Sequence, residues 1–206
     1  LKLNELGYTT IPESFYSKVA EWKSWYQGNV KGFHNYRVRN GESMVNCKRY
    51  SLGMGKKLCE DWANLLMNEK VQITLEGNKE QGFIDRILTE NNFSVKANEM
   101  QEMKSALGTV AYIPRVVGQE VNESGEIVPG NAFGIVLDYV TIENIYPLAW
   151  QNGYISECAF SSVVTRGGRD YLYLQIHRKE DGGEYVIENR IYRYDNEQLA
   201  DEALTN

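Results

Sequence analysis

Cysteine and histidine are scarce in this sequence, and their scarcity limits the chemistry that the chain can perform. The 206 residues include three cysteines and two histidines. No C-x-x-C pair or Cys/His cluster joins Cys47, Cys59 and Cys158, so we expect neither a zinc site nor a disulfide framework. We interpret all three as reduced thiols in an intracellular compartment. His34 and His177 lie far apart in the chain, and no nucleophile or carboxylate stands at a recognisable spacing from His34.

Sequence motifs for catalysis or nucleotide binding are also missing. Ser105 and Ser124 do not stand in a G-x-S-x-G context. The GMGKK run around Gly55 resembles part of a phosphate loop, whose full pattern is G-x-x-x-x-G-K-[ST]. That pattern requires a glycine and a hydroxyl where this chain has Tyr50 and Lys57. We therefore expect no enzymatic activity, no metal site and no cofactor.

Long apolar runs and an excess of basic charge are absent as well. No apolar run approaches the roughly 18 residues of a membrane span, and no signal peptide is present, so we expect no membrane contact. The net charge of −6 argues against a general nucleic-acid-binding surface, although DNA could slide past without being gripped. The length suits one domain or two small ones. Because the chain begins at Leu1 rather than Met, we expect it to be a portion of a longer product.

An amphipathic helix followed directly by a strand is predicted at the centre of the chain, over residues 50–75. Val71, Ile73 and Leu75 alternate with polar residues, as in a half-buried strand. The helix is predicted from an apolar stripe at i, i+4, i+7 and i+8, made of Leu58, Trp62, Leu65 and Leu66.

Three further helices and a long polar loop are predicted around this centre. One runs from Ser14 to Tyr26, one includes residues 83–88, and one spans 93–107 before a glycine cap. Residues 28–41 are predicted as a loop, mobile or contacting a partner. The first helix carries an aromatic stripe that suits either the core or a neighbouring subunit. Its candidate interface residues are Trp22, Trp25 and Tyr26.

The character of the sequence changes near Gly108, after which strands predominate. Pro114 indicates an edge strand or a bulge. Asn-Gly and Gly-Gly turns at 152–153, 167–168 and 182–183 predict an antiparallel meander over residues 148–194, and a final helix is predicted over 197–204. The fold class is therefore α+β, with N-terminal helices packed against a mainly antiparallel sheet. We expect a mainly helical part, 1–108, and a β-rich part, 109–206, although both could form one unit.

A tyrosine-rich and locally basic region of this meander offers a second hypothesis for function. Aromatic side chains on a sheet face can stack on a base or a sugar. Tyrosine also favours strands in general, and such a face can be covered by a neighbour instead. The candidate face for a nucleic acid, a carbohydrate or another partner consists of Tyr171, Tyr173, Arg190, Tyr192 and Arg193.

Three segments resemble a known family of viral structural proteins. LGMGKKLCEDWANLLMNEKVQI, from Leu52, is similar to the N-terminal signature of the phage portal proteins, the head–tail connectors of phages with long non-contractile tails. The resemblance continues from Phe83 to Tyr112 and in WYQGNVKGFH, from Trp25 to His34. It covers most of residues 14–112 and extends loosely into the β-rich part.

This resemblance implies a structural role in the virion, with no enzymatic activity and no cofactor. Portal subunits form a homo-oligomeric ring at one capsid vertex, assembled in the bacterial host cytoplasm, through which DNA is packaged and ejected. Capsid and scaffold proteins, a separate terminase and head-completion adaptor proteins are the implied partners. The segment would be the outer wing of a phage or prophage portal subunit. A closed ring needs two different surfaces on each subunit, and the candidates are the aromatic helix and the sheet edge near Pro114.

Overall fold

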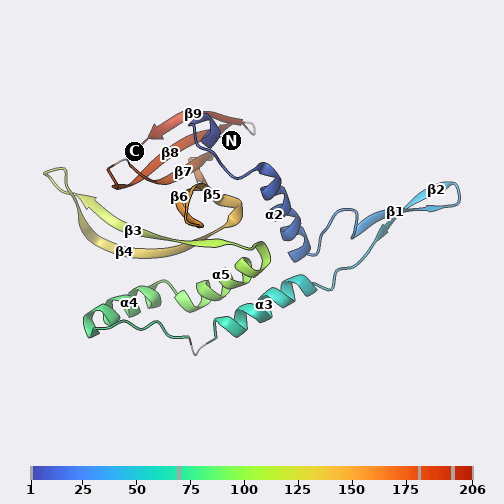
Figure 1. The fold of residues 1–206 in the computed structure, drawn as a ribbon, viewed down its shortest axis with the longest axis horizontal. Helices are drawn as coiled ribbons and strands as arrows, with labels where there is room; N and C mark the ends of the chain where they lie inside the picture. The colour runs from blue at the N-terminus through green and yellow to red at the C-terminus, as the bar shows by residue number, and fades with distance from the viewer. Residues whose placement is uncertain (1, 69–70, 181, 196–197, 206) are drawn as a thin grey trace. The chain divides into compact units, whose positions relative to one another are not determined.

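The predicted α+β class is confirmed by a computed structural model, which describes residues 2–68, 71–180, 182–195 and 198–205 (Figure 1). The helices in these residues are α1 (Lys2–Glu5), α2 (Glu13–Tyr26), α3 (Met54–Leu66), α4 (Asn78–Glu90), α5 (Phe93–Leu107) and the short 3-10 helix η1 (Ile142–Asn144). The strands are β1 (Asn35–Asn40), β2 (Ser43–Lys48), β3 (Val110–Val121), β4 (Ile127–Thr141), β5 (Ile145–Gln151), β6 (Tyr154–Arg166), β7 (Arg169–Lys179), β8 (Tyr185–Asp195) and β9 (Gln198–Thr205).

The chain divides into two compact units. The sheet unit comprises Leu1–Lys18 and Ile142–Asn206, and the helix–ribbon unit comprises Val19–Thr141. Helix α2 therefore contributes its first residues to the sheet unit and the rest to the helix–ribbon unit. The division at Gly108, which rests on composition, stays a prediction.

The sheet unit is built on the predicted antiparallel meander. Its strands follow chain order, β5-β6-β7-β8-β9, and each pairs with the next. Two tight turns account for this order. Asn152 and Gly153 both have positive φ, as do Gly167 and Gly168, which is the backbone of a two-residue type I′ hairpin loop. The Asn-Gly and Gly-Gly signals at these positions are confirmed.

The core of the sheet unit lies on one face of the meander. Leu174 and Ile176 alternate along β7 with Leu172 and are buried. Ala159, which pairs with Ile176, and Tyr192, which pairs with Leu172, lie on the same face. Leu3 of α1 is buried in this cluster. The N-terminal segment therefore covers the apolar side of a sheet formed by the other end of the chain.

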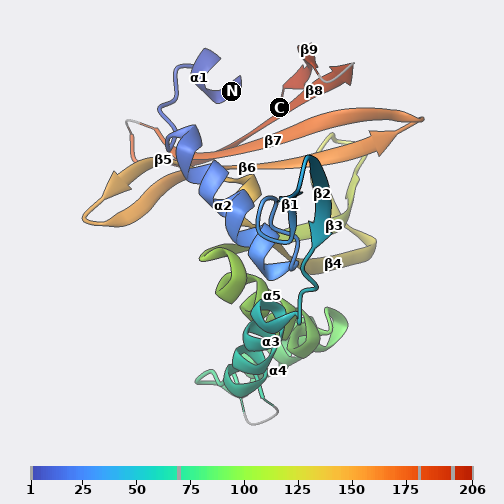
Figure 2. The same cartoon turned by 90° about the vertical axis from the view of Figure 1, so that its right-hand side faces the viewer.

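Helices α3, α4 and α5 gather on one side of the two-stranded β3–β4 ribbon in the helix–ribbon unit (Figures 1 and 2). Asn91, at the end of α4, fixes this arrangement with a buried side-chain amide. The amide donates to the carbonyls of Ile87 and Ile135 at 2.9 and 2.7 Å and accepts from the backbone N–H of Leu137 at 2.8 Å. The side chain thus pairs with β4 much as a neighbouring strand would.

Predictions for the third helix and for Pro114 agree with the structure. Helix α5 has the predicted bounds, and Gly108 follows it with φ 87° and donates its N–H to the carbonyl of Lys104.

Pro114 pairs with Leu137 in a two-stranded ribbon, where both strands are edges. The ribbon also has a register shift between Val117 and Gln119. The missing N–H of proline is tolerated in such a strand because one side has no partner.

The loop predicted over residues 28–41 is wrong in its second half. Residues 35–40 form β1, which pairs with β2, and the two strands are joined at Gly41 and Glu42. Gly41 has φ 63°, as required at the first position of a type II′ loop. Gly41 at the first loop position is the hairpin signal, and its polar, arginine-rich surroundings concealed it.

Two other predicted elements also differ from the structure. Residues 71–75 belong to no sheet, because the side chain of Gln81 occupies the backbone groups that a strand partner would use. It accepts from the N–H of Leu75 at 2.7 Å and donates to the carbonyl of Ile73 at 3.1 Å. The helix predicted over 197–204 is instead β9, from residue 198 onwards, since pairing with β8 overrides the local helix preference. Residue 197 lies outside the described residues.

Candidate interaction surfaces

The apolar stripe of α3 is exposed. Leu58 and Leu65 are 71% and 68% exposed, and Trp62 and Leu66 are also exposed. Helix α3 packs on α5 with a different side, through buried Ala63 and a hydrogen bond of 2.9 Å between the amides of Asn98 and Asn64. The predicted helix is confirmed, but its apolar stripe is exposed among the residues that the structure describes.

A small hollow lies along this stripe. It has a volume of about 350 Å³ and is lined by Leu58, Cys59, Trp62 and Ser105. Burial, and then the nearby carboxylates of Glu102 and Glu60, raise the pKa of the Cys59 thiol. The thiol is therefore held in its neutral form, and the hollow suits an apolar side chain better than an ion.

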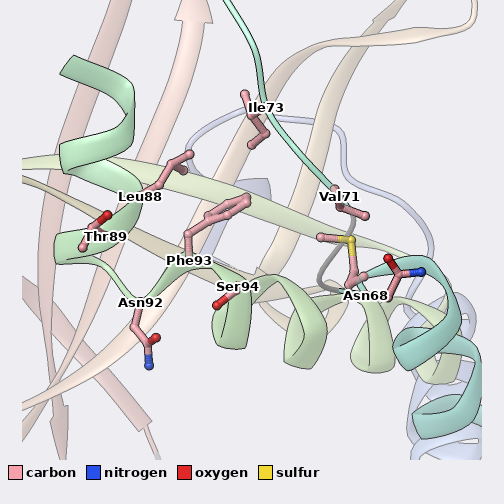
Figure 3. Close-up of a pocket in the computed structure, with 9 residues that line it drawn as sticks. Asn68, Val71, Ile73, Leu88, Thr89, Asn92, Phe93 and Ser94 are labelled. Carbon is pink, nitrogen blue, oxygen red and sulfur yellow. The ribbon is translucent and has the colours of Figure 1, made fainter. Parts of the chain in front are cut away.

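A second hollow, of about 390 Å³, lies between the extended segment after α3 and the junction of α4 with α5 (Figure 3). Leu88 and Phe93 point toward the segment that carries Ile73. None of the described lining side chains titrates near neutral pH, so they supply no general acid or base. They are Met67, Asn68, Val71, Ile73, Leu88, Thr89, Asn92, Phe93 and Ser94.

The aromatic residues of α2 have partners within their own chain. The indole ring of Trp25 lies 5.1 Å from the ring of Phe33 and 6.1 Å from that of His34. Tyr26 donates its hydroxyl to the carboxylate of Glu102. Trp22 and Trp25 remain 40% and 45% exposed, and Tyr26 is half-buried. Trp25 thus anchors local structure, and both tryptophans remain exposed enough to meet a partner.

The five residues of the candidate sheet face do not share one face. In the β7–β8 register, Tyr171 pairs with Arg193, whereas Tyr192 pairs with Leu172 and Arg190 pairs with Leu174. Paired residues point to the same side of a sheet. Tyr192 and Arg190 therefore lie on the core side, where Tyr192 is only 3% exposed. Tyr171, Tyr173 and Arg193 lie on the opposite side.

That opposite side also carries the second histidine. The ring of His177 lies edge-on to Phe160, 5.2 Å away, and one ring nitrogen is hydrogen-bonded to the hydroxyl of Tyr185. Burial lowers the pKa of His177 and raises that of the neighbouring Cys158 thiol to about 11. Both groups are therefore held neutral near pH 7, which makes this side less polar than its sequence indicates.

Arg190 lies among charged groups on the core side of the sheet. It donates to the carboxylate of Glu188, which also lies 3.7 Å from Nε of Arg178. Burial, followed by Glu188, raises the pKa of the nearby Tyr8 phenol. Arg190 is thus part of an ion-pair cluster within the sheet unit.

The β1–β2 hairpin is a candidate interaction surface that the sequence did not predict. Its base is held by Arg49, whose guanidinium lies 5.0 Å from the ring of Phe33 and 4.2 Å from that of Tyr36. Arg49 also donates to the carbonyl of Phe33 at 2.9 Å. The signal that could have revealed this hairpin is Gly41 between two short alternating segments.

Neither a metal site nor a membrane span is found in the described part of the chain. No group of three or more His, Cys, Asp or Glu side chains there could hold a metal ion. No helix in the same residues is both long and apolar enough to cross a bilayer. The exposed apolar side chains described above are of the kind that marks contacts with other macromolecules.

A comparison with known families identifies the kind of protein to which these surfaces belong. The family model described as "Phage portal protein, SPP1 Gp6-like" matches residues 8–165. Because the match covers more than half of the chain, this protein belongs to that phage portal family, whose members are structural virion components and not enzymes. No curated protein and no solved structure matches the chain. The resemblance seen in the sequence is thereby confirmed.

Proposed function

We propose that this chain is a subunit of an oligomeric portal ring, through which phage DNA is packaged and ejected. Family membership supports this function, and one observation in the structure carries it: the exposed stripe of α3, with Leu58 and Leu65 on its surface. A contiguous apolar strip of this kind marks a protein–protein contact. In this proposal the stripe of α3 is covered by a neighbouring subunit, and the exposed halves of Trp22 and Trp25 extend the contact.

The proposed ring also attaches the proteins named by the sequence resemblance. Terminase would dock on the assembled ring during packaging, tail adaptors would follow, and capsid proteins would surround the outer part, to which we assign this chain. Such contacts need exposed surfaces and no catalytic group.

Electron microscopy and sedimentation of the full-length protein test the ring. We expect closed rings with a central hole for the unaltered protein. Changing both Leu58 and Leu65 to Ser should raise the dissociation constant of the assembly more than about tenfold, since burying a leucine contributes about 1.5–3 kcal/mol. Tyr154→Ser, at another highly exposed position, is the matched control and should assemble normally. A protein that stays monomeric at every concentration would contradict the proposal.

A further inference from the structure

The β1–β2 hairpin has two chemically different faces. In its register Val38 pairs with Val45 and Tyr36 with Cys47, which places these four side chains on one side. Arg37 and Arg39 alternate with them and lie on the other side. Val38 and Val45 are both exposed. The Val38–Val45 end of one face is therefore apolar and uncovered, and the other face carries both arginines together with the exposed Met44.

This hairpin gains little support from the rest of its own chain. A two-stranded hairpin alone is marginally stable in water. The contacts of Arg49 with Phe33 and Tyr36 hold its base. They do not reach the Val38–Val45 pair, which is closer to the turn. The outer half of the hairpin thus lacks the apolar cover that a stable ribbon needs.

The hairpin region also differs in charge from the rest of the chain. Residues 28–51 hold five basic side chains and one acidic side chain, a net charge of +4, which leaves −10 for all other residues of a chain with −6. Arg37 donates to the side chain of Asn46 at 3.0 Å and Arg39 to the carbonyl of Gly41 at 3.2 Å. Neither forms an ion pair with a carboxylate in the described residues. Both guanidinium groups can therefore pair with acidic groups of a partner.

The far end of the β3–β4 ribbon has the complementary properties. Val121 pairs with Ile127, and they are 70% and 68% exposed. Glu120 and Glu126 flank this pair along the strands, Glu123 lies in the turn between them, and residues 116–141 contain no lysine or arginine. This ribbon end is thus an exposed apolar pair within an acidic border.

These two surfaces cannot meet within one molecule. In Figure 1 the β1–β2 hairpin and the β3–β4 turn lie at opposite ends of the helix–ribbon unit. A contact between them consequently needs a second copy of the chain. Such a contact is heterologous, because each copy uses a different surface, and repetition of a heterologous contact closes a ring when the rotation allows it.

We propose that the β1–β2 hairpin of one subunit packs on the β3–β4 ribbon end of the next. Val38 and Val45 cover the partner's Val121 and the partner's Ile127. Arg37 and Arg39 reach around the contact to acidic groups at its border, since an arginine stem is long and apolar. This inference rests on the proposed ring and specifies a contact within it.

A nucleic acid is the other occupant that a basic hairpin could attract. DNA would pair with Arg37 and Arg39 but would leave Val38 and Val45 in water. An acidic protein surface with its own apolar pair would supply carboxylates to the two arginines and would cover the two valines. The structure therefore favours a second copy of this chain over DNA.

A charge-swap experiment on the full-length protein tests this contact. Sedimentation is measured for the unaltered protein, for Arg37→Glu with Arg39→Glu, for Glu120→Lys with Glu123→Lys, and for all four changes together. Like charges across an interface disfavour association. Each pair of changes should raise the dissociation constant at least about tenfold. The combined variant should return to within about threefold of the unaltered protein, because opposite charges face each other again.

The control reverses two basic residues elsewhere, Arg166→Glu with Arg169→Glu, and should leave association unchanged. A thermal melt of every variant shows that it is folded. If the unaltered protein assembles and both charge reversals assemble equally well, the hairpin contact is overturned and the ring stands. If the unaltered protein is monomeric, both are overturned. If the Arg37 and Arg39 variant loses only its binding to a labelled duplex DNA, the hairpin binds nucleic acid and the inference is wrong.

Discussion

Tyr26 donates its hydroxyl to Glu102, and this hydrogen bond joins the end of α2 to α5. The phenol is half-buried, and burial together with the bond to Glu102 raises its pKa. Tyr26 was predicted as a subunit contact on the same grounds as the two tryptophans of its helix. The observed partner of Tyr26 lies in its own chain, so its hydroxyl contributes to folding whether or not the residue also contacts a neighbouring subunit.

Tyr26→Phe should lower the free energy of unfolding by about 1 kcal/mol, because Glu102 loses a donor. Urea denaturation measures this loss. Tyr50→Phe is the control, since Tyr50 is 85% exposed, and it should change stability little. Unchanged stability combined with weaker assembly would show instead that the hydroxyl serves a subunit contact.

Asn91→Ala should destabilise the helix–ribbon unit by about 2 to 3 kcal/mol. The change leaves the carbonyl of Ile135 and the N–H of Leu137 without their partner in a buried setting. Thermal unfolding followed by circular dichroism measures the effect. Asn98→Ala removes an exposed hydrogen bond between α5 and α3, and it should lower the free energy of unfolding by less than about 1 kcal/mol. Equal losses in the two variants would contradict the bridging role of Asn91.

Gly28→Ala should destabilise the protein more than Gly32→Ala does. Both glycines have positive φ, 66° and 80°, so each substitution carries the same backbone cost of about 1–2 kcal/mol. A Cβ at Gly28 would also lie 2.7 Å from Cβ of Ser51, whereas nothing lies within 4 Å at Gly32. The difference in unfolding free energy between the two variants gives the cost of crowding where Gly28 approaches Ser51, on the two sides of the hairpin. Equal values would show that Ser51 can move away.

Acidification should weaken the sheet unit through His177. Its pKa is lowered in the folded state, so the unfolded chain binds the proton more readily. The contribution of neutral His177 to stability is fully present above pH 6.5, the ordinary pKa of histidine. It is lost as the pH falls toward the lower pKa of the folded state. Unfolding free energies measured between pH 7.5 and 5.5, roughly the window in which histidine titrates, should fall for the unaltered protein and fall less for His177→Gln. Equal slopes in the two proteins would exclude this histidine as the cause.

Local patterns predicted the elements whose signals lie within a few residues. The bounds of α5, the turns at Asn152 and Gly167, and the alternating core of β7 were all legible in this way. Each depends on periodicity or on a glycine with positive φ, which neighbouring residues determine. Membership of the portal family also followed from short segments in the first half of the chain.

Features that depend on distant partners could not be predicted. Residues 71–75 have the alternation of a strand, but the side chain of Gln81 takes the place of the strand partner. The placement of Tyr192 on the core side depends on the register between β7 and β8, which sequence alternation within one strand does not set. The stripe of α3 has the spacing of a core face, and only the packing of α5 on another side shows that it is exposed.

The position of Gln81 has a consequence for solubility. Strands without a partner can recruit a strand from another molecule and so begin aggregation. Residues 71–75 alternate apolar and polar side chains as a strand does, which makes them a template for such pairing. By holding the N–H of Leu75 and the carbonyl of Ile73, one glutamine blocks the edge on which a foreign strand would grow. One side-chain amide thereby protects an exposed segment against the strand addition that begins aggregation.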